Sequence, residues 1–179
     1  MKVSASLPAC LAVLFAAALS LHSAGAQAGR VRGHVVAAGA EGRVAGTAAA
    51  GQGARGAYAR GHHVASDRQG NVQGGSHAQV VGAAGGQAQR QGSFERHADG
   101  SATRVGSVSA QGAQGATFAS SGSITRDAGG QVDGTRSTSA SGRNGGAYQG
   151  STQVTDGKVT HTATCTNATG AAVDCRGSR

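Results

Sequence analysis

Large apolar side chains are scarce in this sequence. It has no tryptophan, one proline, two tyrosines and three phenylalanines among 179 residues. After position 26 there is no leucine or methionine, which leaves fourteen valines, Ile124 and four aromatic residues as the large apolar side chains. Ordering a backbone costs roughly 1–2 kcal/mol per residue, and the burial of so little apolar area cannot offset that cost. The composition therefore excludes a conventional packed core.

Charged residues are also few, at 13% of the sequence, and basic residues outnumber acidic ones by 16 to 8. Nearly all the basic residues are arginines, and they are spread along the chain instead of clustered. A diffuse positive charge attracts nucleic acid, anionic polysaccharide or lipopolysaccharide in a salt-dependent way. The simpler interpretation is that these charges keep the chain soluble and oppose edge-to-edge pairing of strands.

The N-terminus has the features of a secretory signal peptide. Lys2 supplies a positive charge, residues 7–21 form an apolar run, and small residues precede Gln27 at Ala24 and Ala26. This pattern predicts a signal peptide over residues 1–26 and an exported mature chain. The alternative is a lipoprotein signal at Cys10, which would leave most of the apolar run on the mature protein. No second apolar run follows that could span a membrane.

Cysteine usage agrees with export. Only Cys165 and Cys175 follow the predicted cleavage site, and they are symmetric about Gly170. A tight turn over residues 168–171 would place the two cysteines opposite each other on antiparallel strands. The sequence predicts a disulfide that closes a C-terminal hairpin. Two free thiols or an intermolecular bridge are the alternatives.

The sequence contains 32 glycines, and many of them occur in short clusters that indicate turns. Asp67, Asp99, Asp127 and Asp156 are separated by 32, 28 and 29 residues, and each is followed within three positions by glycine. A second set of glycine-rich turns lies between them, at residues 82–86, 112–115, 142–146 and 169–170. Residues 107–118 also resemble residues 137–148 at an offset of 30. Turn signals thus recur about every fifteen residues, which is typical of successive strands joined by short loops.

The segments between the turns indicate strands. Asp99-Gly100 and Asp156-Gly157 are signals for two-residue type I′ hairpin turns, and residues 158–166 alternate threonine with other side chains. The sequence predicts an all-β fold, an elongated array of antiparallel β-hairpin repeats of about 30 residues, meander or solenoid-like, over residues 56–179. Residues 27–55 are expected to be a degenerate Gly/Ala-rich segment, with a helical turn allowed at residues 46–50. The alternative is a largely disordered glycine-rich chain.

The sequence contains few candidate metal-binding or catalytic residues. His62 and His63 point to opposite faces of a strand, so they cannot share one metal ion without refolding of the turn. A site made by one of them with His77 across the turn at residues 67–70 is the alternative, and solvated histidines are the favoured interpretation. Aspartates about thirty residues apart do not fit calcium-binding repeats that need one every nine. No nucleophile or phosphate-loop motif occurs in a suitable context. We expect no cofactor, no metal site and no catalytic activity.

In its signal peptide and its Gly/Ser/Thr/Ala-rich repeats with Asp-Gly and Asn-Gly turns, the chain resembles uncharacterised exported glycine-rich proteins of Gram-negative bacteria. The resemblance implies export and a role at a surface or in a matrix. We expect a non-catalytic structural or adhesive protein of the periplasm or cell exterior, with self-association or cell-surface polyanions as its partners. The alternative is an arginine-rich, partly disordered binder of polyanions. Four aromatic residues are expected to be the recurring packing anchors, namely Tyr58, Phe94, Phe118 and Tyr148.

Overall fold

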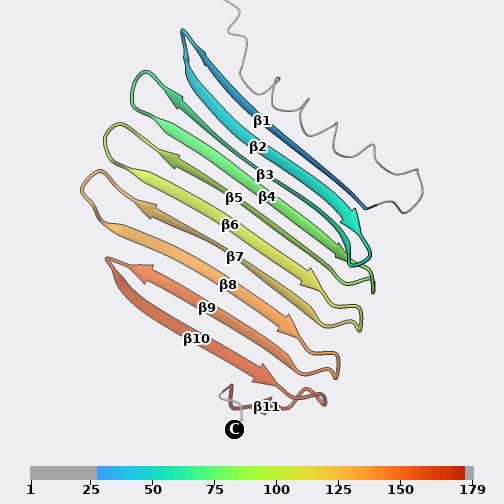
Figure 1. The fold of residues 1–179 in the computed structure, drawn as a ribbon. Coiled ribbons are helices and arrows are strands. Elements are labelled where there is room, and N and C mark those ends of the chain that lie inside the picture. The colour runs from blue at the N-terminus through green and yellow to red at the C-terminus, as the bar shows by residue number, and fades with distance from the viewer. Residues whose placement is uncertain (1–27, 176–179) are drawn as a thin grey trace, which may run out of the picture.

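The computed structural model describes residues 28–175, which form one antiparallel sheet of eleven strands. Each strand is hydrogen-bonded to its neighbours in sequence, so the spatial order is the chain order (Figure 1). The strands are β1 (Gly29–Gly39), β2 (Gly42–Gly53), β3 (Gly56–Asp67), β4 (Val72–Gly82), β5 (Gln87–Arg96), β6 (Ala102–Gln111), β7 (Thr117–Arg126), β8 (Val132–Ser141), β9 (Ala147–Thr155), β10 (Lys158–Thr166) and β11 (Ala172–Val173). The predicted all-β array of hairpins is confirmed, and it is an open meander.

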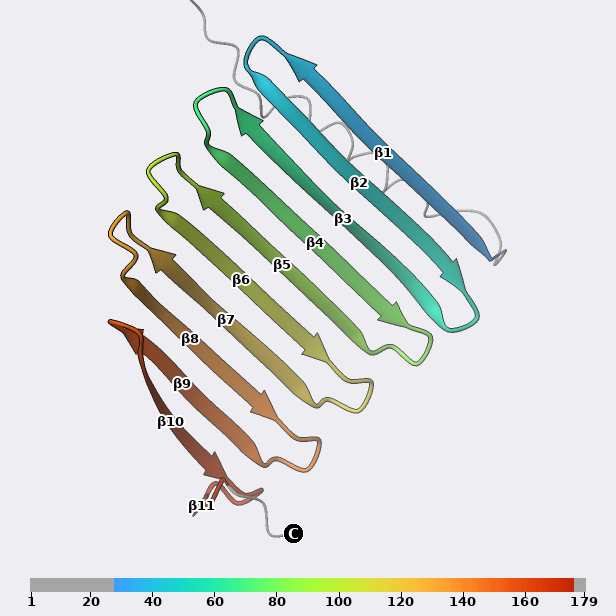
Figure 2. The same cartoon turned by 60° about the vertical axis from the view of Figure 1, so that its left-hand side comes forward.

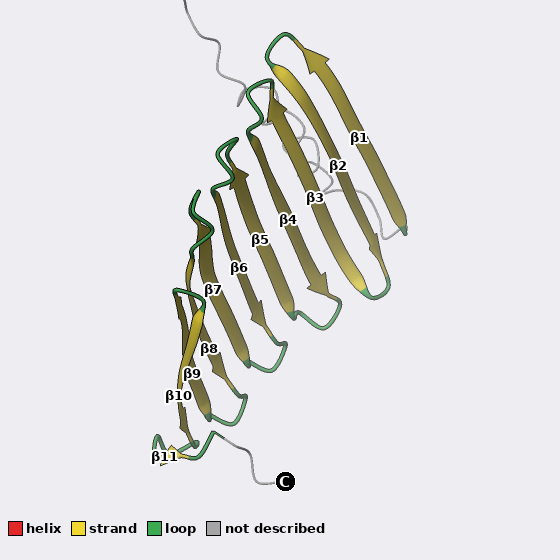
Figure 3. Ribbon diagram, turned by 90° about the vertical axis from the view of Figure 1, so that its left-hand side faces the viewer, coloured by secondary structure: helices red, strands yellow, loops and turns green. Residues whose placement is uncertain are grey.

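The sheet is a single twisted layer, seen from the side in Figure 3. No hydrophobic side chain among the described residues is buried, in agreement with the expected lack of a core. Residues 29–53, expected to be degenerate, form β1 and β2 of the same sheet. The helical turn allowed at residues 46–50 was wrong, because those residues pair with β1 on one side and β3 on the other. Sheet pairing on both sides overrides the helix propensity of three alanines.

The loops confirm the fifteen-residue spacing of turns. Glycines with positive φ occur every fifteen residues at Gly70, Gly85, Gly100, Gly115, Gly130 and Gly145. In the β4–β5 loop, Gly85 N–H donates to the Gly82 carbonyl at 3.0 Å, and Gly82 N–H donates to the Gly86 carbonyl at 2.7 Å. This is a type I turn followed by a left-handed residue, the usual three-residue hairpin connection. A left-handed residue is needed at the fourth position, and glycine adopts that conformation without strain.

The two Asp-Gly dipeptides form different turns. Asp156 and Gly157 have φ of 51° and 75°, and Thr155 pairs with Lys158, so this turn has the predicted two residues. At Asp99-Gly100 only Gly100 has positive φ, and the loop is longer, because His97 N–H donates to the Ser101 carbonyl. The prediction of a two-residue turn here was wrong. The Asp99 carboxylate instead accepts the Ser101 amide at 2.8 Å inside the longer loop.

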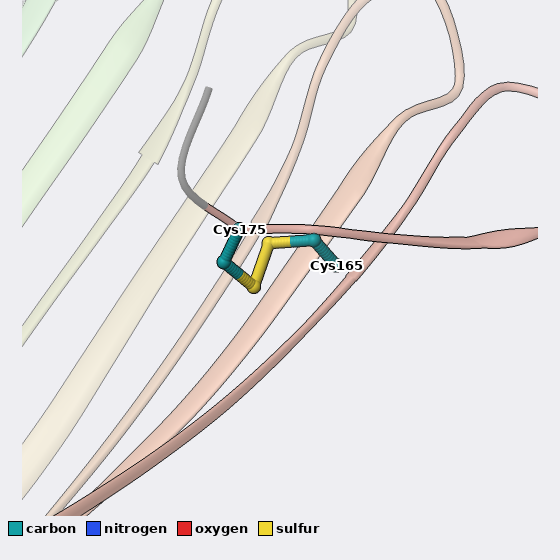
Figure 4. The surroundings of a disulfide bond; sticks show 2 residues. All are labelled: Cys165 and Cys175. Carbon is teal, nitrogen blue, oxygen red and sulfur yellow. A yellow bond between two sulfur atoms is a disulfide. The ribbon is translucent and has the colours of Figure 1, made fainter. Parts of the chain in front are cut away.

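Cys165 and Cys175 form the predicted disulfide, with their Cα atoms 5.2 Å apart (Figure 4). Their register differs from the expected one, since Cys165 pairs directly with Val173. Asn167 N–H donates to the Ala171 carbonyl, so the loop is centred one residue earlier than predicted. The bond therefore reaches diagonally to the residue two positions beyond the paired one, and it holds the short strand β11 against β10.

Aromatic side chains cover glycines in this sheet. A Cβ atom added to Gly74 would collide with the ring of Phe94, and one added to Gly51 would lie 2.8 Å from Cε1 of Tyr58. The ring of Tyr148 likewise occupies the space above Gly150. Large side chains that lie over neighbouring glycines shield the backbone hydrogen bonds and add packing where the sheet has no second layer. Three of the four predicted aromatic anchors, Tyr58, Phe94 and Tyr148, thus pack over glycines of their own sheet.

We predict that Gly115→Ala destabilises the sheet by about 1–2 kcal/mol. The added Cβ meets nothing within 4 Å, so the cost comes from the φ of +85° and not from a collision. Gly112→Ala in the same loop is the matched control, because its Cβ would be at ordinary contact distance and its φ is not positive. Urea unfolding followed by circular dichroism measures both variants, and equal stabilities would contradict the prediction.

Candidate functional site

The strand pairings assign every strand residue to one of two faces. Directly paired residues lie on the same face, and successive residues along a strand alternate between faces. From β3 to β9 each pair joins residues of equal parity, so the even-numbered residues share one face. The even residues of β1 and the odd residues of β2 and β10 lie on that face too. We call it the arginine face and the opposite side the serine face.

Charge is segregated between these two faces. All the arginines within the described strands lie on the arginine face, namely Arg30, Arg32, Arg43, Arg60, Arg90, Arg96, Arg104, Arg126 and Arg136. The carboxylates within those strands, Asp67, Glu95 and Asp133, lie on the serine face. The arginines are therefore spread in sequence but gathered in space. This face is the strongest candidate for a functional surface.

Three arginines form a line across the N-terminal half of the sheet. Arg32, Arg60 and Arg90 lie in one row of paired residues, on β1, β3 and β5, with Ala49 and Ala78 between them. Strands in a sheet are about 4.8 Å apart, so successive arginines in this row are roughly 10 Å apart. With the histidines of the adjacent row, they line an open groove that runs across the strands.

A second open groove crosses β3 to β9 and overlaps the first. Its floor includes Gly92, Gly106 and Gly122, which lie in one row, and Arg104 and Arg136 are among the residues that line it. The missing side chains of the three glycines lower the surface between the neighbouring rows. A Cβ on Gly122 would collide with the Thr135 carbonyl oxygen, so only glycine fits there. The two grooves together form a band across the arginine face, called the cationic band here, with arginines at Arg32, Arg60, Arg90, Arg104 and Arg136.

Arg136 is held in place on this face. Its Nε donates to the Oγ of Ser120 at 2.9 Å. Ser120 Oγ in turn donates to the Ser137 carbonyl oxygen at 3.0 Å. Ser120 is the only polar side chain among the described residues that is buried. This hydrogen-bond chain restricts the guanidinium before any ligand arrives, which reduces the entropy that binding would cost.

Apolar rows flank the cationic band on both sides. One row contains Val36, Val64, Phe94, Ile124, Val154 and Val159, with Arg104 between Phe94 and Ile124, and the other contains Tyr58, Val80, Phe118 and Tyr148, with Arg30 at its β1 end. The four predicted aromatic anchors thus all lie on the arginine face. Phe94 and Phe118 remain 37% and 36% exposed, so part of each ring is available to a ligand. A ligand on this face would meet guanidinium groups and apolar surface together.

The predicted turn aspartates have a structural role at one end of the sheet. The Asp67 Oδ1 accepts backbone N–H groups of Gln69 and Asn71 at 2.8 and 2.9 Å, while Oδ2 accepts the Asn71 side-chain amide. These bonds, that from the Asn71 side chain foremost, lower the pKa of Asp67. Hydrogen bonds from the side chain and then the backbone of Ser101 lower the pKa of Asp99 in the same way. The Asp127 carboxylate accepts a hydrogen bond from the backbone N–H of Gln131, and the Asp156 carboxylate accepts one from the side-chain amide of Gln131.

The three histidines considered as metal ligands do not share one face, although His63 and His77 are diagonal neighbours on β3 and β4. His62 lies on the arginine face, whereas His63 and His77 lie on the serine face, opposite Gly75 and Gly61. Over residues 28–175 no group of three or more histidine, cysteine, aspartate or glutamate side chains is placed to hold a metal ion.

Comparison of the chain with protein-family models, with curated proteins and with solved structures finds no match. Within the described part of the chain, no helix is long and apolar enough to cross a membrane.

Sequence reasoning missed the arginine face, although a signal for it was present. Arg60 and Arg90 are thirty residues apart, as are Arg96 and Arg126. Thirty residues is one hairpin, so residues at that offset occupy equivalent positions on strands of the same direction. The offset of 30 residues that relates residues 107–118 to residues 137–148 therefore also places the arginines of each pair on a common face.

We predict that the β3–β4 turn loosens in acid. Because the folded pKa of Asp67 is lowered, the stability that its carboxylate adds is complete above the ordinary aspartate pKa of about 4 and is lost as the pH falls through the lower folded value. Hydrogen exchange of the Asn71 amide should therefore accelerate in acid, relative to the exchange expected at each pH. The Ala171 amide is the internal control, because Asn167 accepts it with an amide oxygen that does not titrate in this range.

Asp67→Asn gives the matched variant for this test. An asparagine at position 67 can accept the same two backbone N–H groups as Asn167 does in the β10–β11 loop. In this variant, the protection of the Asn71 backbone amide against hydrogen exchange should not depend on pH. If wild type and variant lose protection in parallel, the carboxylate is not the cause.

Proposed function

We propose that this protein is a non-catalytic, exported structural or adhesive protein whose arginine face binds acidic polysaccharide at the cell surface. The observation that carries the proposal is the segregation of charge, with all the described strand arginines on one face and the strand carboxylates on the other. Export rests on the N-terminal sequence pattern at residues 1–26, which lies outside the described residues.

The grooves support binding in preference to catalysis. Those on the arginine face are open to solvent along their length and cross several strands. An active site ordinarily needs a water-poor pocket in which neighbouring groups shift a pKa. An open cationic band suits an extended polymer, which can contact many strands at once with little affinity at any one contact.

The chemistry of the face favours a polysaccharide. Arginines about 10 Å apart in a row are more widely spaced than the phosphates of one strand of duplex DNA, which recur every 3.4 Å along the helix axis. The rows beside them offer apolar side chains, and sugar rings carry apolar C–H faces as well as carboxylates. A polymer of uronic acids therefore matches both kinds of row. Nucleic acid and lipopolysaccharide are the competing polyanions.

We predict that replacing Arg32, Arg60 and Arg90 together by glutamine lowers affinity for polygalacturonate roughly tenfold or more at low salt, because three adjacent contacts are lost. The control variant has glutamine in place of Arg55, Arg68 and Arg143, which lie in loops, so its net charge changes by the same amount. Binding of each variant to immobilised polygalacturonate is measured by surface plasmon resonance over a series of salt concentrations.

Affinity falls as salt rises, and the plot of log affinity against log salt should be less steep by roughly two for the face variant, in proportion to the contacts removed. Equal losses in the face and loop variants would show that only net charge matters and would contradict the proposal. Tighter binding to single-stranded DNA or to lipopolysaccharide than to polygalacturonate would reject the polysaccharide as ligand while retaining the face as the site.

A further inference from the structure

The sheet has two open edges. Strand β1 pairs only with β2, so its outer edge has no partner among the described residues. Strand β10 pairs with β11 only at Cys165 and Thr166, which leaves the outer edge of residues 158–164 unpaired. Figure 2 shows the two edges on opposite sides of the sheet. A row of unpaired backbone N–H and C=O groups is a template for another strand.

The two edges are complementary in direction. The first ten strands alternate, so β1 and β10 run antiparallel to each other. If a second copy is placed beside the first with its β1 against β10, the antiparallel alternation of the sheet continues across the boundary. An edge of one kind thus meets an edge of the other kind, and each copy still has a free edge for the next copy. Such a contact is heterologous, and its repetition gives an open filament unless the rotation between copies closes a ring.

The edges are also complementary in register. Continuing each row of paired residues across the boundary places Val36 opposite Val159, His34 opposite His161, and Arg32 opposite Ala163. The arginine faces of the two copies then form one surface. A slip by one residue would exchange the faces and bring the arginines of one copy beside the threonines of the other.

We propose that this chain associates edge to edge with copies of itself, residues 158–164 of β10 pairing antiparallel with residues 31–37 of β1 in the next copy. Charge permits this register, because Lys158 would face Ala37 and Arg32 would face Ala163, so no like charges are directly opposite at neutral pH. The disulfide-linked β11 occupies the edge at Cys165 and blocks any extension of the pairing beyond Thr164.

One competing mode of association is the stacking of two arginine faces on each other. Two arginine faces brought together would oppose nine guanidinium groups to nine, without carboxylates on either side. Edge pairing avoids that repulsion and satisfies backbone groups that otherwise need water. The edge is therefore the surface that suits a second copy, while the arginine face stays accessible.

We predict that Ala163→Lys weakens association about three- to fivefold, since it places a lysine opposite Arg32 of the next copy. Adding Arg32→Glu should restore association to at least the wild-type level, because opposite charges then face each other. The control adds Arg60→Glu instead, which makes the same charge change in the same row but on β3, away from the edge. Sedimentation velocity of the exported, oxidised chain at low salt measures each variant over a concentration series, with circular dichroism to confirm folding.

A covalent test fixes the register without relying on charge. Val36→Cys and Val159→Cys variants, mixed under mild oxidation, should form mixed disulfide-linked dimers on non-reducing gels. Val36→Cys mixed with Val154→Cys is the control, because Val154 lies in the same row but on β9. Ala163→Lys should still bind polygalacturonate as a monomer, which separates this proposal from the one on the arginine face.

Three outcomes would overturn the proposal. They are a monomer at every concentration, rescue of Ala163→Lys by Arg60→Glu as complete as by Arg32→Glu, and cross-linking of Val36→Cys to the control cysteine as efficient as to Val159→Cys. The last two would indicate association through net charge or through stacked faces.

Discussion

The hydrogen bond between neighbouring backbones is the interaction on which this structure depends. No described hydrophobic side chain is buried, so no core stabilises one strand independently of the next. Each strand is instead held by the ladders on its two sides and by side chains that cross to the adjacent strand. Stability in such an arrangement is close to a sum over neighbouring pairs, as in solenoid proteins. The short loops add to it, because they keep each ladder local in sequence.

The two faces of this sheet differ in the side chains that they present. From β5 to β10 the serine face consists of serine, threonine and glutamine, apart from Val105, Ala119, Ala147, Glu95, Asp133 and Lys158. Such a face offers hydroxyl and amide groups to water along most of its area. The arginine face concentrates charge, aromatic rings and branched aliphatic side chains. Like charges can gather there because each guanidinium stays in water, where repulsion is screened over about a Debye length.

Much of this fold could be predicted from the sequence because glycine marks the positions where the backbone must turn left-handed. The spacing of those glycines predicted the strands, and the pair Cys165 and Cys175 predicted the disulfide. What could not be predicted was the choice between loops of similar composition. Asp156-Gly157 makes a two-residue turn and Asp99-Gly100 does not, because Ser101 supplies two hydrogen-bond donors to Asp99 and stabilises the longer loop. One added loop residue shifts the register of everything that follows.

The same shift explains why the face of each arginine was not predicted. Whether Arg60 and Arg104 lie on the same side depends on the register of every ladder between β3 and β6. Composition and local spacing do not reveal that register. The arginine face is thus determined by loop lengths as much as by the positions of the arginines in the sequence.

Uniform loops have a consequence for how this sheet can change in size. Because left-handed glycines from Gly70 to Gly145 recur every fifteen residues, one complete hairpin occupies thirty residues and returns the chain to the same end of the sheet. Duplication or deletion of one such unit would conserve strand direction, parity and therefore the side on which every downstream residue emerges. Loss of a single strand residue would invert all of them. The sheet can therefore be widened by whole hairpins without any change in which side chains share a face.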